Sequence, residues 1–404
     1  MNSFLPYGRQ QIDDDDIDAV VSVLKGSFLT TGPHVKTLEE NLEQALRAKY
    51  ALTCSSATAG LHMACQAMGL CSKSAVIVPA LSFLASASAP SFTGAEVVFA
   101  DVEAGSGLLT PETFLSAIKS HTGEPIKAVV AVHLSGRVCD MPAIKKLADQ
   151  YDILVIEDAC HALGASYLDS QGHQHIVGGC SHSDMSVFSF HPVKNIAAGE
   201  GGVVSTNKKT LAKQLELCRN HGMIRDPQYW DSRDLGFDLD GQPNQWYYEV
   251  HSPAPNYRMS DINAALANSQ LKKLSAFVSR RAELAELYDI GLASLAPSIL
   301  PPLRQENVDL GWHLYSVRID FTRLGTSRRT LIDYLHKRSI GSQVHYIPLP
   351  WQPYWKKYGW ERESFPGASA YYEKTLSLPL FPAMEEEDIA RVVTALSDYA
   401  NDIV

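Results

Sequence analysis

The sequence predicts an α/β protein with a mainly parallel central sheet, followed by a smaller α+β domain. Short apolar runs rich in Val and Ile recur, helical patterns separate several of them, and the pattern changes after about residue 260. Parallel strands that are buried on both faces read as continuous apolar runs and are joined by crossover helices. We therefore expect an N-terminal arm and a large α/β domain at 1–260, and a connecting helix with a small α+β domain at 261–404.

Two amphipathic helices are expected first. In residues 13–26, acidic side chains stand at the helix start, and an apolar face that includes Ile17 and Leu24 follows. Residues 33–49 repeat this pattern with leucines four positions apart. The apolar runs come next, with helical segments such as 140–151 between them. Strands are expected at 75–80, 96–102, 127–134, 153–159, 186–190 and 202–206.

The pattern after residue 260 differs. Residues 260–295 read as one long amphipathic stretch that Ser260 can cap, which suits a connector between domains. A strand, helix, strand order follows at 312–349. Residues 227–256 are the longest irregular segment and contain the aromatic run WYYE. Irregular segments of that length in compact domains are usually functional or disordered, and the aromatic residues favour function.

Composition excludes several classes of protein. The formal net charge of −10 over 404 residues leaves no strongly basic surface, so a nucleic acid partner is not expected. Seven scattered cysteines without a CxxC pair indicate a reducing cytosol, and no metal site is expected. The N-terminus lacks a signal-peptide pattern, and the longest uncharged stretch, 74–95, is broken by two prolines. A cytoplasmic protein without a membrane span is therefore expected.

Candidate functional residues stand at strand ends. Ligands of open parallel sheets bind beyond the carboxyl ends of the strands. One expected strand ends at Asp158, another leads into His191 and Lys194, and Ser56 precedes a helix start. We therefore expect these segments to face one crevice.

The helix start is a candidate anion site. Ser56, Ala57 and Thr58 stand where free backbone N–H groups and the positive end of the helix dipole suit a phosphate. The alternative is an ordinary N-cap. The chain has no GxxxxGK motif, and GEGG at 199–202 is not a GxGxxG turn after a first strand. A Walker nucleotide site and a nicotinamide oxidoreductase are therefore not expected.

Asp158 and Lys194 complete the set. A carboxylate at the end of an apolar strand is costly to desolvate without a partner, although it can also cap the next turn. Most lysines are solvated, but Lys194 follows a buried strand, where lost solvation would lower its pKa and make the amine nucleophilic. Pyridoxal 5'-phosphate (PLP) requires three groups of this kind: a binding site for its phosphate, an aspartate that pairs with its pyridinium nitrogen, and a lysine that forms an imine with its aldehyde.

Longer motifs then carry a family resemblance. EDACHALGASY at 157–167, FSFHPVK and GEGGVVST within 188–206, and NYRMSDINAALANSQLKKL at 256–274 resemble the DegT/DnrJ/EryC1/StrS family of PLP-dependent sugar aminotransferases. The resemblance runs from end to end and implies the type I PLP-dependent transferase (aspartate aminotransferase) fold. Shorter segments such as FLTTGP, WYYE and QVHYIPL resemble the transaminases that make UDP-4-amino-4,6-dideoxy-N-acetyl-beta-L-altrosamine for pseudaminic acid.

The resemblance implies roles for the matching residues. Lys194 would bind PLP covalently and move the substrate proton, and Asp158 would keep the pyridine nitrogen protonated. His161 would lie beside the ring and Phe83 would stack on it, although either residue could also be ordinary core. The phosphate would be held by Ser56, Ala57, Thr58 and Ser189. Asn256 of the partner subunit would also reach the phosphate, which implies a homodimer with shared active sites.

The implied reaction moves an amino group from L-glutamate to C4 of a UDP-linked 4-keto-6-deoxy-N-acetylhexosamine, namely UDP-2-acetamido-2,6-dideoxy-beta-L-arabino-hex-4-ulose. The segments that resemble substrate-binding stretches contain Tyr7, Leu29, Thr30, His345 and Tyr346. His345 and Tyr346 could equally be ordinary strand residues. Three alternatives remain open: an aminotransferase for another dTDP- or UDP-linked keto sugar at C3 or C4, a PLP-fold regulatory protein without turnover, and a nicotinamide oxidoreductase, which the missing GxGxxG turn disfavours.

The chain also departs from the family pattern. Ser55 stands where many relatives have asparagine, Ala197 and Ala198 where they have two threonines, and Ala254 and Pro255 where they have Gly-Tyr. None of these changes removes a catalytic group, and we expect their effect, if any, on phosphate contacts, loop rigidity or sugar choice. The lysine that relatives with dehydratase activity replace by histidine is retained, so transamination is the expected activity.

Overall fold

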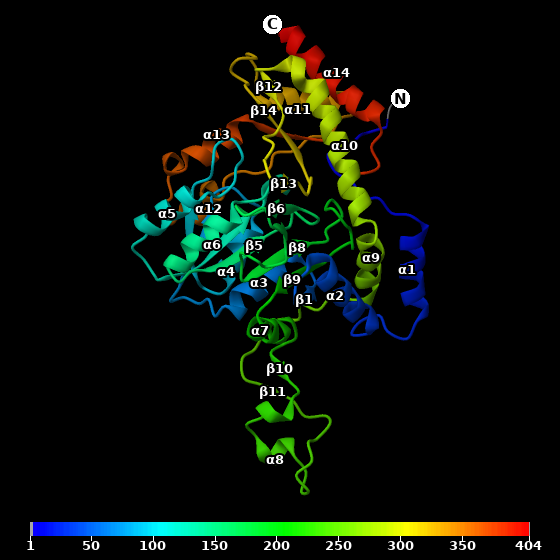
Figure 1. Cartoon of the computed structure of the whole chain (residues 1–404), viewed down its shortest axis with the longest axis vertical. Coiled ribbons are helices and arrows are strands. Elements are labelled where there is room, and N and C mark those ends of the chain that lie inside the picture. The colour runs from blue at the N-terminus through cyan, green and yellow to red at the C-terminus, as the bar shows by residue number, and fades with distance from the viewer. Residues whose placement is uncertain (1–2, 404) are drawn as a thin grey trace.

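The computed structural model describes residues 3–403 and has a seven-stranded central sheet. Its order is β1-β9-β8-β5-β4-β2-β3, and β9 alone runs antiparallel to its neighbours, β1 and β8. The mainly parallel α/β fold is therefore confirmed (Figure 1). Its strands are β1 (Tyr50–Cys54), β2 (Ala75–Pro79), β3 (Glu96–Ala100), β4 (Ile126–Val132), β5 (Leu154–Asp158), β8 (Met185–Ser189) and β9 (Gly202–Thr206).

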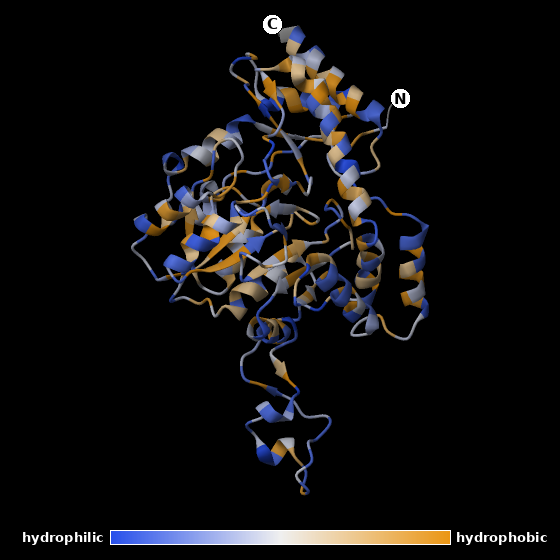
Figure 2. Ribbon diagram, in the orientation of Figure 1, coloured by the Kyte–Doolittle hydropathy of each residue, from blue (hydrophilic) through white to orange (hydrophobic). Residues whose placement is uncertain are grey.

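Helices cover the sheet and close a continuous apolar core, and Figure 2 shows hydrophobic residues concentrated in the central strands. One group of neighbours is α3, α4 and α7, and another is α5 with α6. Strand β1 was not among the expected strands, because its five residues follow a helix without a turn signal and contain Thr53 and Cys54. The helices are α2 (Pro33–Leu46), α3 (Ala57–Ala67), α4 (Ala85–Phe92), α5 (Pro111–Ser120), α6 (Met141–Gln150) and α7 (Lys209–Arg219).

Helix α1 (Asp14–Lys25) begins with a capping box at Asp13 and packs beside α9. It buries Asp16, whose carboxylate accepts a hydrogen bond from Gln270 Nε2 at 2.6 Å and pairs with Lys273 Nζ at 3.0 Å. The apolar face expected from the sequence instead leaves Ile17 52% and Leu24 55% exposed. Val23 of α1 is also buried, so the polar pairing of Asp16 and part of the apolar face together set how α1 docks.

The connector is two helices, not the single stretch that the sequence predicts. Helix α9 (Asp261–Leu271) ends at a turn of two lysines, and α10 (Leu274–Leu292) continues into the small domain (Figure 1). Polar contacts at the end of α9 explain the break, because Gln270 binds Gln11 and Asp16 and Lys273 binds Asp13.

The small domain has its own apolar core. A three-stranded antiparallel sheet, β12-β14-β15, packs with α10, α11 and α14. Helices α12 and α13 follow α11 in the chain, yet Trp355 and Tyr371 on them belong to the core of the large domain. The division at residue 260 stays a prediction. The elements are β12 (Ile299–Leu300), β14 (Tyr315–Ile319), α11 (Arg328–Lys337), α12 (Pro353–Lys356), α13 (Pro366–Lys374), β15 (Thr375–Leu378) and α14 (Glu386–Ile403).

The irregular segment after α7 forms an arm that extends away from the large domain (Figure 1). Strands β10 (Met223–Ile224) and β11 (Glu249–Val250) pair at its base, and α8 (Arg233–Gly236) lies near its tip. A further small sheet, β13-β6-β7, joins β6 (Ser166–Leu168), β7 (Gln174–Ile176) and β13 (Val308–Asp309). Within residues 3–403, no helix combines the length and hydrophobicity needed to cross a bilayer.

Candidate active site

A cavity of about 780 Å³ lies beyond the carboxyl ends of β5 and β8, where the sequence places the candidate residues. This position follows the rule for open parallel sheets. The cavity brings together residues from the N-terminal arm, the large domain and the segment after α11. Eleven of the predicted site residues line it: Tyr7, Ser56, Ala57, Thr58, Phe83, Asp158, His161, Ser189, Lys194, His345 and Tyr346.

The start of α3 forms one wall of the cavity and suits an anion. Ser56 is the N-cap, and its hydroxyl accepts a hydrogen bond from the N–H of Ala59 at 3.2 Å. The N–H groups of Ala57 and Thr58 precede the first possible intrahelical partner and are left for a ligand. The first residue of β9, Gly202, lies so close that a Cβ would be 2.8 Å from the nitrogen of Ala57. The two main chains therefore form a tight cradle.

Asp158 is the last residue of β5 and is 5% exposed. Its Oδ2 accepts a 2.6 Å hydrogen bond from the hydroxyl of Ser86 on α4, which in turn lies 2.6 Å from the hydroxyl of Ser82. Its Oδ1 accepts a bond from the N–H of Cys160 at 3.3 Å. These bonds hold the carboxylate at the cavity wall with lone pairs left for a ligand proton.

Lys194 follows β8 in a turn closed by its own N–H, which donates to the carbonyl of His191. Its Nζ lies 3.4 Å from Nε2 of His313. Desolvation lowers the pKa of Lys194 to about 8, and the charge of Arg281 adds to this effect, while Cys160 and Asp158 oppose it. About a tenth of the amine is therefore uncharged and nucleophilic at pH 7, far more than for a solvated lysine.

Three buried histidines surround this lysine. Burial and the charge of Lys194 lower the pKa of His161 and of His313 well below the usual value, and lower that of His345 to about 3. The N–H of Ser135 donates to Nδ1 of His161, so its ring proton is on Nε2, facing the hydroxyl of Tyr346 at 3.2 Å. These three rings are therefore neutral and add no positive charge beside Lys194.

Aromatic side chains form the remaining wall. The ring of Phe83 is 52% exposed, with its centroid 5.8 Å from that of Tyr346. Tyr7 approaches His345 with ring centroids 5.5 Å apart. Burial raises the pKa of the Tyr346 hydroxyl, which therefore stays protonated and can donate or accept a hydrogen bond. A flat aromatic ligand and a polyhydroxylated one both suit this wall.

Three predicted site residues lie outside the cavity of the same protomer. Leu29 is 50% exposed, and its carbonyl accepts a hydrogen bond from the N–H of Asp261. Thr30 forms a β-bridge with Ser260. Asn256 is exposed and lies just after the arm that follows α7. Its Oδ1 accepts a hydrogen bond from the main-chain N–H of Arg258 at 3.3 Å. The structure of a single chain therefore does not bring these residues to the site.

Sequence reasoning missed several cavity residues. His313 comes from the segment before β14, 119 positions from Lys194, and read as part of a strand. Glu200 and Gln343 also line the cavity, and Ser86 lies behind Asp158. Glu200 lies within the motif GEGG that the sequence analysis quoted, whereas only the fold could bring His313 to the lysine.

Two histidine groups lie away from the cavity. His173 and His175 both contact the carboxylate of Asp169, at 3.3 and 3.0 Å. On the arm, polar atoms of Asp231, Glu249 and His251 lie within 4.8 Å of one another. Glu249 already accepts hydrogen bonds from two main-chain N–H groups and from Tyr247. Hydrogen bonding within the protein accounts for this grouping.

The residues present fit PLP. The cradle at α3 offers N–H donors to a phosphate, Asp158 offers a buried carboxylate to a ring nitrogen, and Lys194 offers a desolvated amine to an aldehyde. PLP, when bound, supplies an electron-withdrawing ring that stabilises a carbanion on the substrate. The cavity volume, within the usual range of ligand sites, also leaves room for a second ligand.

Comparison with known proteins agrees with this geometry. Residues 10–397 match the DegT/DnrJ/EryC1/StrS aminotransferase family. SpsC of Bacillus subtilis, a spore coat polysaccharide biosynthesis protein, is 35% identical over 399 residues, which are 98% of this chain and 97% of SpsC.

Two solved structures share the fold over nearly the whole chain. Helicobacter pylori PseC, an aminotransferase of pseudaminic acid biosynthesis, is 27% identical with a TM-score of 0.85, covering 99% of this chain and 100% of that one. Spr1654 of Streptococcus pneumoniae, assigned as a sugar aminotransferase and solved in its PLP form, is 26% identical with a TM-score of 0.85 and the same coverage. The chain therefore belongs to the DegT/DnrJ/EryC1/StrS aminotransferase family and is a PLP-dependent sugar aminotransferase.

Proposed function

We propose that the enzyme transfers the amino group of L-glutamate to C4 of a UDP-linked 4-keto-6-deoxy-N-acetylhexosamine. The proposed sugar substrate is UDP-2-acetamido-2,6-dideoxy-beta-L-arabino-hex-4-ulose, and the reaction belongs to pseudaminic acid biosynthesis. The observation that carries the aminotransferase chemistry is the convergence of Lys194, Asp158 and the start of α3 in one cavity. The likeness to PseC over the whole chain supports the choice of sugar.

In this proposal each residue acts at a defined atom. Lys194 Nζ removes and returns the proton at the substrate carbon, and its pKa near 8 suits both tasks. Asp158 holds the proton of the ring nitrogen, and the N–H groups of Ala57 and Thr58 hold the phosphate with the hydroxyl of Ser189. Phe83 covers one face of the ring, and His161 is placed beside it by Ser135 and Tyr346.

Tyr7, His345 and Tyr346 are proposed to contact the sugar nucleotide, because they line the same cavity as Lys194 and the start of α3. Leu29 and Thr30 would reach a substrate only in an assembly. The proposed location is the cytoplasm, and the seven free cysteines agree with a reducing compartment.

The proposed functional unit is a homodimer with shared active sites. Among residues 3–403, Lys194 is the only lysine or arginine that lines the cavity, although the ligands carry phosphates and carboxylates. An exposed apolar surface of Ile17, Leu24, Phe28 and Leu29 supports burial against a second copy.

Complementation tests the shared site. Lys194→Ala and Asn256→Ala, each inactive alone, are mixed, unfolded and refolded together. If Asn256 serves the partner's cavity, mixed dimers contain one intact site and about a quarter of wild-type activity returns, because half of the dimers are mixed. If dimers that are shown to contain one copy of each variant have no activity, the shared site is contradicted.

Substrate choice is tested with purified, PLP-loaded protein, L-glutamate and matched UDP- and dTDP-linked 4-keto sugars. We expect formation of 2-oxoglutarate and a 4-amino product, identified by NMR, with the UDP-linked sugar. The higher identity to SpsC than to PseC favours a second candidate, an aminotransferase that supplies another amino sugar for a polysaccharide. Turnover restricted to a different nucleotide or a 3-keto sugar would select that candidate.

A further inference from the structure

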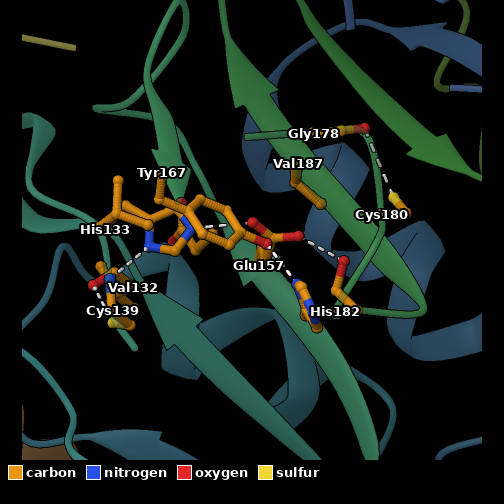
Figure 3. Close-up of polar contacts among 12 residues, drawn as sticks. Val132, His133, Cys139, Glu157, Tyr167, Gly178, Cys180, His182 and Val187 are labelled. Carbon is orange, nitrogen blue, oxygen red and sulfur yellow. Dashed lines mark hydrogen bonds and ion pairs between the residues drawn. The ribbon is translucent and has the colours of Figure 1, made fainter. Parts of the chain in front are cut away.

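A buried carboxylate lies directly behind the proposed site. Glu157 precedes Asp158 on β5, so the two side chains point to opposite faces of the sheet. Glu157 is 2% exposed and lies on the far side from the cavity, among the side chains that Figure 3 shows. Neither the reaction nor the proposed cofactor contacts account for a carboxylate at this position.

His133 ties Glu157 to Asp158. Nε2 of His133 lies 2.9 Å from Oε2 of Glu157 (Figure 3). The main-chain N–H of His133 donates to the carbonyl of Asp158 at 3.0 Å. The main-chain N–H of Cys139 donates to Nδ1 of His133, so the ring proton is on Nε2 and points at Glu157. One residue therefore bonds the side chain of Glu157 and the main chain of Asp158.

The second oxygen of Glu157 extends the tie to β8. Oε1 accepts a short hydrogen bond from the hydroxyl of Ser183, which lies just before β8. Strand β8 leads to Ser189 and Lys194. Glu157 therefore links the end of β4, which leads to His133, with β5 and the entry to β8.

Burial of this carboxylate requires compensation. An unpaired buried charge is strongly unfavourable, and removing one partner of a buried pair leaves the other uncompensated. Burial by itself would raise the pKa of Glu157, but the bond with His133 and the hydroxyl of Ser183 lower it. Glu157 therefore stays an ionised acceptor, and its two bonds are strong and directional.

We propose that the Glu157–His133 pair is a positioning device for Asp158, which sets the distance between the Asp158 carboxylate and the cofactor ring. The proposal rests on the role of Asp158 given above. Ser86 on α4 holds the carboxylate of Asp158 itself, and the Glu157–His133 pair holds the end of the strand that carries it. Loss of the pair lets the end of β5 shift, and small shifts of a group that orients a ligand weaken its binding.

Titration of apo protein with PLP, followed by absorbance, tests the proposal in the full-length chain. Glu157→Ala should weaken PLP binding about tenfold, as loss of an outer partner does at comparable sites, and should shift the absorbance band of bound PLP. Glu157→Gln keeps an acceptor for His133 and can donate to Ser183, so its affinity should stay within about threefold of wild type. If Glu157→Ala does not fold, Ser183→Ala removes one bond to Glu157 and should weaken PLP binding in the same direction.

Tyr167→Phe is the matched control. It removes the 2.8 Å hydrogen bond between Tyr167 and His182 in the same buried region and leaves the hydrogen bonds of Glu157 with His133 and Ser183 in place (Figure 3). It should lower the melting temperature and leave PLP affinity unchanged. Weakened binding in Tyr167→Phe that matches Glu157→Ala, or an unchanged affinity and spectrum in both Glu157→Ala and Ser183→Ala, overturns the proposal.

Asp158→Asn separates the proposed role of Asp158 from the positioning role of the Glu157–His133 pair. If Asp158→Asn leaves PLP affinity and the spectrum unchanged, the proposed role of Asp158 is refuted, and the positioning role of the Glu157–His133 pair is refuted with it. If Asp158→Asn weakens binding while Glu157→Ala does not, only the positioning role of the pair is refuted.

Discussion

Covalent capture of PLP by the apo enzyme should follow the ionisation of Lys194. Only the uncharged amine attacks an aldehyde, so the rate rises with pH and levels off above the pKa of Lys194. Desolvation of the ammonium group moves that pKa down to about 8 from the usual 10.5, because it disfavours the charged form. The midpoint of the rate profile should therefore lie near pH 8.

The size of the effect follows from these two values. At pH 7.5 about a quarter of the amine is uncharged with a pKa of about 8, whereas about one part in a thousand is uncharged with an unperturbed pKa. The capture rate at pH 7.5 should therefore exceed that of a solvated lysine by about two hundredfold at equal intrinsic reactivity.

The assay mixes apo protein with PLP between pH 6 and pH 10, stops samples with borohydride at timed intervals, and quantifies the labelled peptide by mass spectrometry. Model lysine peptide treated in parallel provides the unperturbed profile. A midpoint near that of the peptide would falsify the argument that burial tunes this amine. Labelling of another lysine in place of Lys194 would contradict its assignment.

Three further predictions follow from particular contacts. Ser86→Ala removes the 2.6 Å bond to Asp158 and should weaken PLP binding about fivefold to tenfold, the cost of one buried hydrogen bond, in an absorbance titration; unchanged affinity would show that the bond is dispensable. Gly202→Ala places a Cβ 2.8 Å from the nitrogen of Ala57 and the carbonyl of Phe188, so PLP affinity and melting temperature should both fall; a variant unchanged in both would mean that the cradle is not tight. Leu284→Ala in the fully buried core of the small domain should cost about 2–5 kcal/mol in urea unfolding, and a smaller loss would indicate that the core refills the cavity.

Local sequence patterns predicted much of the fold. Buried parallel strands must be apolar throughout, so the runs of Val and Ile located β2, β3, β4, β5, β8 and β9. The patterns failed where pairing depends on distant residues. Helix α1 leaves Leu24 exposed because the buried side of the helix carries Asp16, which binds Gln270 and Lys273. No local pattern can reveal these distant partners. The stretch 260–295 breaks for the same reason. Gln270 and Lys273 bind Gln11 and Asp13 near the N-terminus, and these residues are about 260 positions away along the chain.

The sequence by itself determined the chemistry of this enzyme, because strand ends and a helix start have recognisable local signatures. A lysine after a buried strand, an aspartate at a strand end and hydroxyls at a helix start indicated PLP, and the structure places all three at one cavity. Only the tertiary structure decided what tunes them. His313 reaches Lys194 from the small domain, Ser86 reaches Asp158 across two strands, and His133 joins Glu157 behind the sheet. Desolvation and hydrogen-bond geometry depend on neighbours brought together by packing, and spacing along the chain does not encode them.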